Sequence, residues 1–129
     1  YLYLFKNQLS GEIPIEIGGL INLYKLDLSS NQLSGEIPHE IGSLTKLNSL
    51  RLFSNELKGK IPSSIGNLLE LEFLFLQENQ LSGNMPIEIE KLKRLTYLGL
   101  YSNQLIGDIP PSIKKLSNVQ DLINSLGLD

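Results

Sequence analysis

The sequence predicts an α/β solenoid, a stack of short coils in which parallel strands line one face and 3₁₀ turns or loops return the chain. The first observation is a period of 24 residues that runs through five copies without an insertion. The second is that seven columns carry an aliphatic residue or Met in all 35 positions, starting at Leu2, Leu4, Leu9, Ile13, Ile17, Leu20 and Leu23. One 24-residue unit cannot bury so many aliphatic side chains, so neighbouring copies must stack to form a common core.

The predicted strand of each copy is short. In the second copy, Leu26-Asp27-Leu28 alternates apolar and polar residues with period two, which is typical of a half-buried strand. Equivalent segments recur 24 residues apart, so we expect these strands to pair in parallel with their aliphatic columns inside.

One asparagine follows each strand, at Asn7, Asn31, Asn55, Asn79 and Asn103. We expect a structural role for this column, in which the amide satisfies backbone groups at the end of the strand for about 0.5–1.5 kcal/mol each. The pattern Leu-x-Gly-x-Ile-Pro comes next, with Met85 replacing Ile once. Gly permits a tight turn and Pro has no N–H for a ladder, so this segment is predicted to end the strand and turn the chain.

The remainder of each copy is predicted to return as one or two 3₁₀ or helical turns. Its apolar residues are three apart, as in Ile41, Leu44 and Leu47.

The period divides residues 1–119 into five repeats, namely 1–23, 24–47, 48–71, 72–95 and 96–119. It fails afterwards, because Asn124 falls where a Leu is due. Residues 120–129 are therefore predicted to form an irregular sixth repeat or a C-terminal cap, and a helix through residues 113–122 is one interpretation. We expect the chain to be a segment of a longer protein, because it opens in mid-strand and neither end has a polar capping face.

Composition excludes several classes of partner. Eleven basic and fourteen acidic residues leave a net charge of −3, too small to indicate a nucleic-acid or polybasic membrane surface. The absence of cysteine excludes disulfides and thiolate metal sites. No apolar run approaches the roughly 20 residues that span a bilayer, so we expect no membrane insertion in this segment.

Catalytic residues are not indicated. His39 is the only histidine and stands in a variable column after Ile-Pro, where a solvated turn residue is expected. No Ser-His-Asp set, zinc cluster or phosphate-binding loop can be assembled. The sequence therefore predicts no enzyme, no cofactor and no metal site.

The aromatic residues are the informative feature. All nine fall on the 24 outward-pointing strand positions, where chance would place about two. One interpretation is that the rings stack across strands and stabilise the sheet by about 0.2–1 kcal/mol per pair. The other, which we favour, is a protein-binding surface with aromatic anchors, since so many exposed rings without a partner would promote aggregation.

The central column of this surface reads Tyr3, Asp27, Arg51, Phe75 and Gly99. We expect Asp27 to pair with Arg51, and Arg51 to lie on the ring of Phe75. Gly99 is expected to leave a notch for a ligand side chain. The predicted hot spot centres on Phe75, Tyr97 and Tyr101, with Arg51 binding a carboxylate. The complete predicted partner-binding set is Tyr3, Tyr24, Asp27, Arg51, Phe53, Phe73, Phe75, Tyr97, Gly99 and Tyr101.

Residues 23–38, LYKLDLSSNQLSGEIP, resemble the plant-type leucine-rich repeat, whose pattern is LxxLxLxxNxLxGxIPxxLGxL. The resemblance extends from Leu2 to Val119, and it lacks the cysteine-paired cap that usually precedes the first repeat. Ectodomains of plant receptor-like kinases and receptor-like proteins are similar, as are polygalacturonase-inhibiting proteins. The resemblance implies a leucine-rich repeat solenoid, a curved right-handed superhelix that binds other molecules on its concave or lateral face.

The function implied by this resemblance is non-catalytic recognition of a peptide, protein ligand or co-receptor on the concave face, in an extracellular or cell-surface location. Two alternatives stay open. The chain could be a structural or scaffold subunit of a larger intracellular or organellar assembly, or an inhibitor of a secreted glycan-degrading enzyme.

Overall fold

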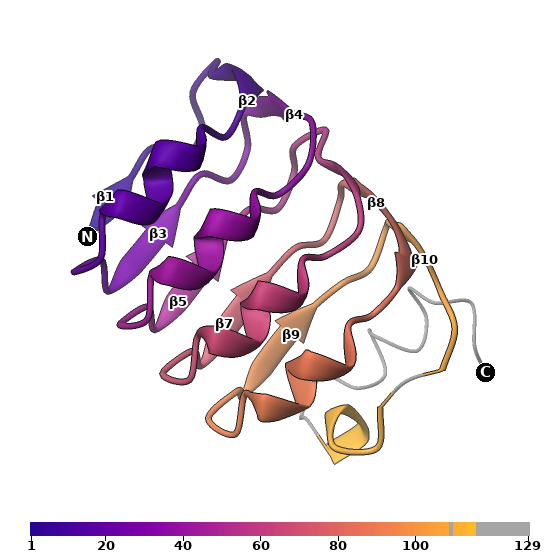
Figure 1. Ribbon diagram of the computed structural model, residues 1–129. Helices are drawn as coiled ribbons and strands as arrows, with labels where there is room; N and C mark the ends of the chain where they lie inside the picture. Colours follow the sequence, from indigo (N-terminus) through magenta and orange to yellow (C-terminus); the bar gives the residue numbers. More distant parts are fainter. Residues whose placement is uncertain (109, 116–129) are drawn as a thin grey trace.

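The computed structural model describes residues 1–108 and 110–115, and it is a stack of coils that repeat every 24 residues (Figure 1). For reference, coils 1 to 5 begin at residues 1, 24, 48, 72 and 96. Each coil contains a strand, a second short strand and a 3₁₀ helix. The predicted fold class, a solenoid with a parallel sheet and 3₁₀ returns, is confirmed.

The main sheet has five parallel strands in sequence order. They are β1 (Leu2–Tyr3), β3 (Lys25–Asp27), β5 (Ser49–Arg51), β7 (Phe73–Phe75) and β9 (Tyr97–Gly99). The register pairs Leu26 with Leu50 and Leu50 with Leu74, so each aliphatic column of the sequence is a row of neighbouring side chains. The outward surface of this sheet is called the sheet face below, and it corresponds to the expected concave face.

A second set of short strands lies where the sequence predicted only a turn. They are β2 (Ser10–Glu12), β4 (Gln32–Ser34), β6 (Lys58–Gly59), β8 (Gln80–Asn84) and β10 (Gln104–Ile106). Strand β2 pairs with β4, and β6, β8 and β10 pair in that order, all in parallel. The prediction of a turn alone was wrong because stacking brings equivalent extended segments within hydrogen-bond distance. The glycine in each segment, such as Gly35 with a φ of 73°, then redirects the chain.

The return segments are 3₁₀ helices, as predicted. They are η1 (Ile15–Gly19), η2 (His39–Ser43), η3 (Ser63–Asn67), η4 (Ile87–Lys91) and η5 (Ile113–Lys115). A proline precedes each of the first four. Figure 1 shows these helices side by side along the face opposite the main sheet.

The predicted helix through residues 113–122 and the predicted sixth repeat or cap at 120–129 lie largely or wholly outside the described residues. Within residues 1–108 and 110–115 there is no α-helix, and no helix there could cross a membrane.

Close contact between neighbouring 3₁₀ helices requires glycine. A Cβ atom on Gly66 would lie 2.7 Å from both the Cβ and the carbonyl oxygen of Glu88 in the next coil. The same position in coil 1, Gly18, would meet Glu40 at 2.8 Å, whereas an added Cβ on its neighbour Gly19 would have nothing within 4 Å. The glycine of this column is therefore a spacing residue between coils.

The core is a continuous aliphatic stack. Leu26, Leu50, Leu74 and Leu98 are completely buried, and the other aliphatic columns fill the space between the sheet and the 3₁₀ helices. Coil 1 departs from the prediction that all columns lie inside, since Leu20 is 46% exposed. The reason is that coil 1 forms the end of the described stack and has a neighbour on one side only.

The asparagine column joins consecutive coils. Asn55 Oδ1 accepts a hydrogen bond of 3.0 Å from the N–H of Leu33, one coil earlier. Its Nδ2 donates to the carbonyls of Leu28, Leu52 and Phe53, at 3.0, 3.2 and 3.3 Å. Asn79 in the next coil bonds the four equivalent groups, which are the N–H of Leu57 and the carbonyls of Leu52, Leu76 and Gln77. Asn55 and Asn79 are buried, whereas Asn7 in the end coil is exposed.

The residue before each of these asparagines has a left-handed backbone, with φ between 54° and 58°. These residues are Lys6, Ser30, Ser54, Glu78 and Ser102. This conformation is costly for residues other than glycine. The asparagine amide holds it by bonding the two carbonyls that precede the left-handed residue, as Asn55 does with Leu52 and Phe53. The sequence pattern did not reveal it, because the five side chains share no common type.

Replacement of Asn55 by Ala is expected to lower the free energy of unfolding strongly. The buried N–H of Leu33 would lose its acceptor, which alone costs about 1–3 kcal/mol. The matched control is Asn67→Ala, at an exposed position, which should stay within about 0.5 kcal/mol of the parent. Urea unfolding followed by circular dichroism measures both, and equal losses for the two variants would contradict the structural role of the column.

Replacement of Gly66 by Ala is expected to push two coils apart and to cost about 1–3 kcal/mol, as overpacking does. Gly19→Ala is the control, because the added methyl group meets no atom. Thermal unfolding of the two variants checks this. A Gly66→Ala protein as stable as Gly19→Ala would show that the coils do not need this close contact.

Candidate functional site

All nine aromatic side chains lie outside the buried core, as the sequence predicted. Tyr1, Tyr3, Phe5 and Tyr24 are exposed, whereas the five rings from coils 3 to 5 are half-buried against one another or against the sheet. The core contains only aliphatic residues and one Met.

The rings form two clusters on the sheet face. Tyr1 contacts Tyr3 and Tyr24 with centroid distances of 6.0 and 5.7 Å, and Tyr3 contacts Phe5 at 6.5 Å. In the second cluster, defined by Phe53, Phe75 and Tyr97, the ring of Phe75 stacks on Tyr97 at 4.4 Å and lies 6.1 Å from Phe53. Ring stacking accounts for part of the aromatic pattern, so both interpretations of these residues have a structural basis.

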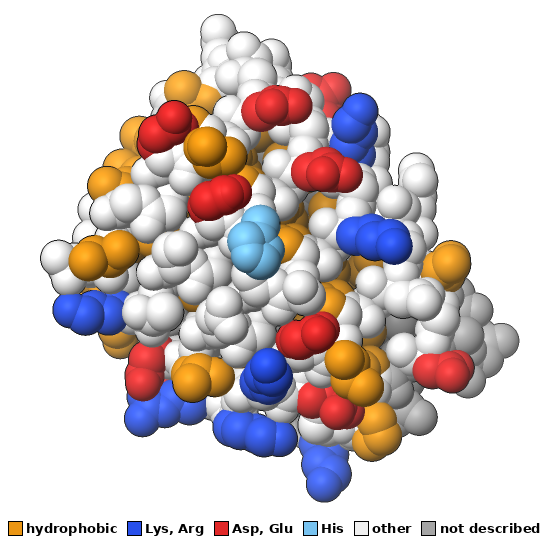
Figure 2. All heavy atoms as spheres, viewed as in Figure 1, with side chains coloured by type: hydrophobic (Ala, Val, Ile, Leu, Met, Phe, Trp, Pro, Cys, Tyr) orange, Lys and Arg blue, Asp and Glu red, His pale blue; other side chains and the backbone are white. Residues whose placement is uncertain are grey.

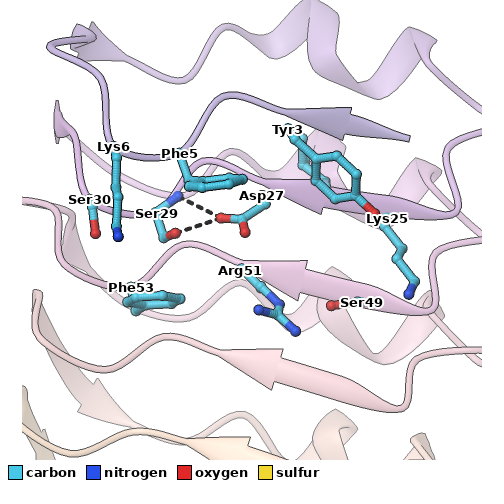
Figure 3. Close-up of a pocket in the computed structure, with 11 residues that line it drawn as sticks. Tyr3, Phe5, Lys6, Lys25, Asp27, Ser29, Ser30, Ser49, Arg51 and Phe53 are labelled. Carbon is cyan, nitrogen blue, oxygen red and sulfur yellow. Dashed lines mark hydrogen bonds between the residues drawn. The ribbon is translucent and has the colours of Figure 1, made fainter.

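A hollow of about 510 Å³ lies between the two clusters. Figure 3 shows the rings of Phe5 and Phe53 on either side of it, with Asp27 and Arg51 beside these rings and Lys6 and Lys25 toward opposite ends. Its lining is Tyr3, Phe5, Lys6, Lys25, Leu26, Asp27, Ser29, Ser30, Ser49, Arg51 and Phe53.

Coil 2 creates this hollow because it places the short side chains of Ser29 and Ser30 level with the large side chains of the neighbouring coils. Ser29 follows Phe5 and precedes Phe53 in the same column, so bulky rings flank a short hydroxyl side chain. The backbone confirms that these residues are neighbours, since Lys6 N–H donates to Ser29 O and Ser30 N–H donates to Phe53 O, both at 3.0 Å. The sequence analysis missed the hollow, although the Phe–Ser–Phe order of this column is a signal for it.

Asp27 does not pair with Arg51, which corrects the prediction. Asp27 is 8% exposed, and its Oδ1 accepts hydrogen bonds from the N–H and the hydroxyl of Ser29, at 3.0 and 2.6 Å. Within the described part of the chain, the only ion pair joins Arg94 and Glu70, away from the sheet face. The two-residue spacing of Asp27 and Ser29 along one strand gives a shorter and better-fixed contact than a flexible arginine on the next strand.

The expected contact between Arg51 and Phe75 is confirmed. The guanidinium carbon lies 4.8 Å from the ring centroid, in the range of a cation–π interaction. Lys25 Nζ is 6.0 Å from the ring centroids of both Tyr1 and Tyr24, at the limit of that range. The aromatic clusters therefore position two of the three cations that border the hollow.

The predicted notch at Gly99 is wrong. Gly99 is buried, and a Cβ atom there would lie less than 2.5 Å from Gln77 Oε1 and 3.1 Å from Tyr97 Cε1. The glycine makes room for the side chain of Gln77, which is 6% exposed, and leaves none for a ligand. Tyr97 fills the remaining space by stacking on Phe75.

The other predicted site residues are spread along the sheet face. Phe73 is in register with Ser49 and Tyr97, and it is half-buried. Tyr101 is also half-buried and has no ring contact with another aromatic side chain in residues 1–108 and 110–115. Of the predicted hot spot, only Phe75 and Tyr97 are therefore in ring contact, and none of its three residues lines the hollow.

The opposite face carries the single histidine. Figure 2 shows His39 near the middle of this face, surrounded by carboxylates above it and by lysines or arginines toward the lower edge. Its side chain is exposed, and its carbonyl oxygen accepts a hydrogen bond of 2.6 Å from the hydroxyl of Ser64. No group of three or more His, Asp or Glu side chains suited to a metal ion occurs in the described residues.

Comparison with known proteins agrees with this architecture. A family model described as a leucine-rich repeat region matches residues 1–122. The comparison with curated protein sequences found no match.

Several solved structures are similar. The BIR2 ectodomain from Arabidopsis thaliana has a TM-score of 0.88 and 40% identity over 92% of this chain and 62% of its own. The Arabidopsis receptor kinase HAESA, in complex with the peptide hormone IDA and the co-receptor SERK1, has a TM-score of 0.85 and 40% identity over 89% of this chain and 20% of its own.

The ectodomain of the membrane receptor kinase GASSHO1/SCHENGEN3 from Arabidopsis thaliana, in complex with CASPARIAN STRIP INTEGRITY FACTOR 2, has a TM-score of 0.81. It is 44% identical over 85% of this chain and 13% of its own. The chain thus spans about a fifth or less of the two receptor kinase ectodomains.

Double-mutant cycles are expected to separate the two contacts proposed for Arg51. Arg51→Ala and Phe75→Ala should couple by about 0.5–1 kcal/mol in the free energy of unfolding, because the cation lies over the ring. Arg51→Ala and Asp27→Ala should be additive within about 0.3 kcal/mol, because Asp27 is bonded to Ser29. Urea unfolding of the single and double variants gives both values. A larger coupling for Asp27 with Arg51 than for Phe75 with Arg51 would restore the ion pair and contradict this assignment.

Proposed function

We propose that this chain, which belongs to the leucine-rich repeat family, is a non-catalytic recognition module that binds a peptide or another protein on its sheet face. The observation that carries the proposal is the hollow between the two aromatic clusters, bordered by Lys6, Lys25 and Arg51. Aromatic side chains and arginine are the residues most enriched among binding hot spots.

The rigidity of the sheet face supports this function. Strands β3, β5 and β7 are paired in parallel on both sides, and a row of fully buried leucines, Leu26, Leu50, Leu74 and Leu98, lies beneath the sheet. Rings that are already stacked lose little conformational entropy when a ligand covers them, so a larger share of the contact energy contributes to affinity.

The similar structures also support it. HAESA is solved with a peptide hormone and a co-receptor, and GASSHO1/SCHENGEN3 with CASPARIAN STRIP INTEGRITY FACTOR 2. GASSHO1/SCHENGEN3 is a plant membrane receptor kinase, and we extend that setting to this chain by proposing a cell-surface location. His39 is remote from the hollow, on the opposite face, and we assign it no catalytic role.

The proposed binding surface comprises Tyr3, Tyr24, Asp27, Arg51, Phe53, Phe73, Phe75, Tyr97 and Tyr101. Gly99 is omitted because its surface is covered by Gln77 and Tyr97. The five repeats read from the sequence remain the proposed units of this module.

The experiment is a selection of peptides from a phage-displayed library of random 12-residue sequences against the purified chain. Peptides that bind should lose at least about ten-fold in affinity when Phe53, which lines the hollow, and Phe75, which supports Arg51, are both replaced by Ala. Such a loss is typical of hot-spot rings. The matched control is Ile15→Ala with Ile87→Ala, which removes two exposed side chains from the 3₁₀ side and should change affinity less than two-fold. Circular dichroism verifies that both double variants are folded. Peptides that bind the Phe53/Phe75 variant as tightly as the parent would place recognition elsewhere.

A further inference from the structure

The charged side chains of the sheet face are separated along the stack. Lys6, Lys25 and Arg51 are the cations among the outward strand positions, and they come from coils 1, 2 and 3. The outward positions of coils 4 and 5 hold no cation, and coil 4 adds Glu72 and Glu78. One end of the sheet face is therefore positive and the other negative.

The cations around the hollow have no acidic partner in the described part of the chain. Arg51 is exposed and lies over the ring of Phe75, which supports the guanidinium without neutralising it. The nearest candidate, Asp27, has one oxygen engaged by Ser29, and it balances only one of three positive charges. The hollow thus keeps a surplus of positive charge.

The hollow also offers apolar walls. Figure 3 shows the rings of Phe5 and Phe53 facing across it, while the floor is formed by the short side chains of Ser29 and Ser49 and by Leu26. Positive charge beside two rings suits a carboxylate that is adjacent to an apolar group.

The distance between the two charged regions fits an extended peptide. Coil 4 is two strand spacings from coil 2, or about 10 Å, at roughly 4.8 Å per spacing. An extended chain advances roughly 3.3 Å per residue, so about three residues separate a group in the hollow from one over coil 4.

We propose that the hollow binds an acidic side chain of an extended peptide, next to an aromatic residue of that peptide, and that a basic residue about three positions away lies near Glu72 and Glu78. This inference rests on the proposed function and specifies its ligand class and its orientation along the stack. Charge complementarity selects the peptide and fixes its register, whereas the rings provide most of the contact area.

The test uses two synthetic probes, acetyl-Asp-Phe-Gly-Lys-amide and its reversed sequence acetyl-Lys-Gly-Phe-Asp-amide, which cover both chain directions. Each is titrated into the ¹⁵N-labelled chain, and binding is followed by chemical shifts of backbone amides. At least one probe should shift the amides of Ser29, Ser30 and Arg51 with millimolar affinity. Replacement of its Asp by Asn should weaken binding about three- to five-fold, the effect of a partly exposed ion pair.

Variants of the chain locate the two charges. Arg51→Gln should weaken the Asp probe about three- to five-fold, and Arg51→Lys should retain most of its affinity. The double variant Glu72→Gln with Glu78→Gln should bind the Asp probe more weakly than the parent chain does. It should bind an analogue of this probe, in which Gln replaces Lys, as tightly as the parent chain does. Arg94→Gln is the matched control, since Arg94 is paired with Glu70 outside the sheet face.

The outcomes separate this inference from the proposed function. Equal binding of the Asp and Asn probes would overturn the inference. Library-selected peptides that depend on Phe53 and Phe75 but contain no acidic residue would also overturn it. In both cases the proposed function would stand. Sodium galacturonate that shifts the same amides with equal affinity would overturn the peptide class in favour of an acidic sugar. If neither the probes nor any library peptide binds the sheet face, both proposals fail.

Discussion

The structure depends on the hydrogen bonds by which one asparagine per coil joins two coils. Asn31, Asn55, Asn79 and Asn103 each bond the backbone of the coil before them, and their Nδ2 groups also hold the turn of their own coil. A buried amide that satisfies backbone donors and acceptors on two coils leaves little freedom in their relative position. The repeat length follows, since an added or missing residue would displace the amide from its partners.

Because the coils must stack in this fixed way, some residues of each coil form the stack, whereas others only face outward. The aliphatic columns form the stack and are nearly identical in every coil, and Gly18, Gly42 and Gly66 permit close contact between the first four coils. The outward strand positions take no part in the core and are free to differ. The aromatic rings accumulate there, outside the core, where rings such as Phe75 and Tyr97 support one another and also present an apolar surface.

Differences between coils, and not the repeat itself, create the candidate site. The hollow exists because Ser29 stands between Phe5 and Phe53. Its positive charge exists because Lys6, Lys25 and Arg51 border it together with a single carboxylate, Asp27. The polarity of the sheet face has the same origin, since its cations lie in coils 1 to 3 and its acidic residues Glu72 and Glu78 lie in coil 4. A ligand would therefore recognise departures from the repeat pattern.

The sequence by itself determined the solenoid, the parallel order of the main strands, the 3₁₀ returns and the placement of every ring outside the core. A strict 24-residue period allows only one way to stack identical aliphatic columns. Tertiary structure alone decided the second strands, the left-handed residues such as Ser30, and the contacts on the sheet face. Arg51 contacts Phe75 and not Asp27, and Gln77 occupies the space above Gly99. Both contacts depend on which side chains of adjacent coils fill the same volume. A repeat pattern shows which residues are aligned in neighbouring coils, but it does not contain the distances and rotamers that determine which of their side chains are in contact.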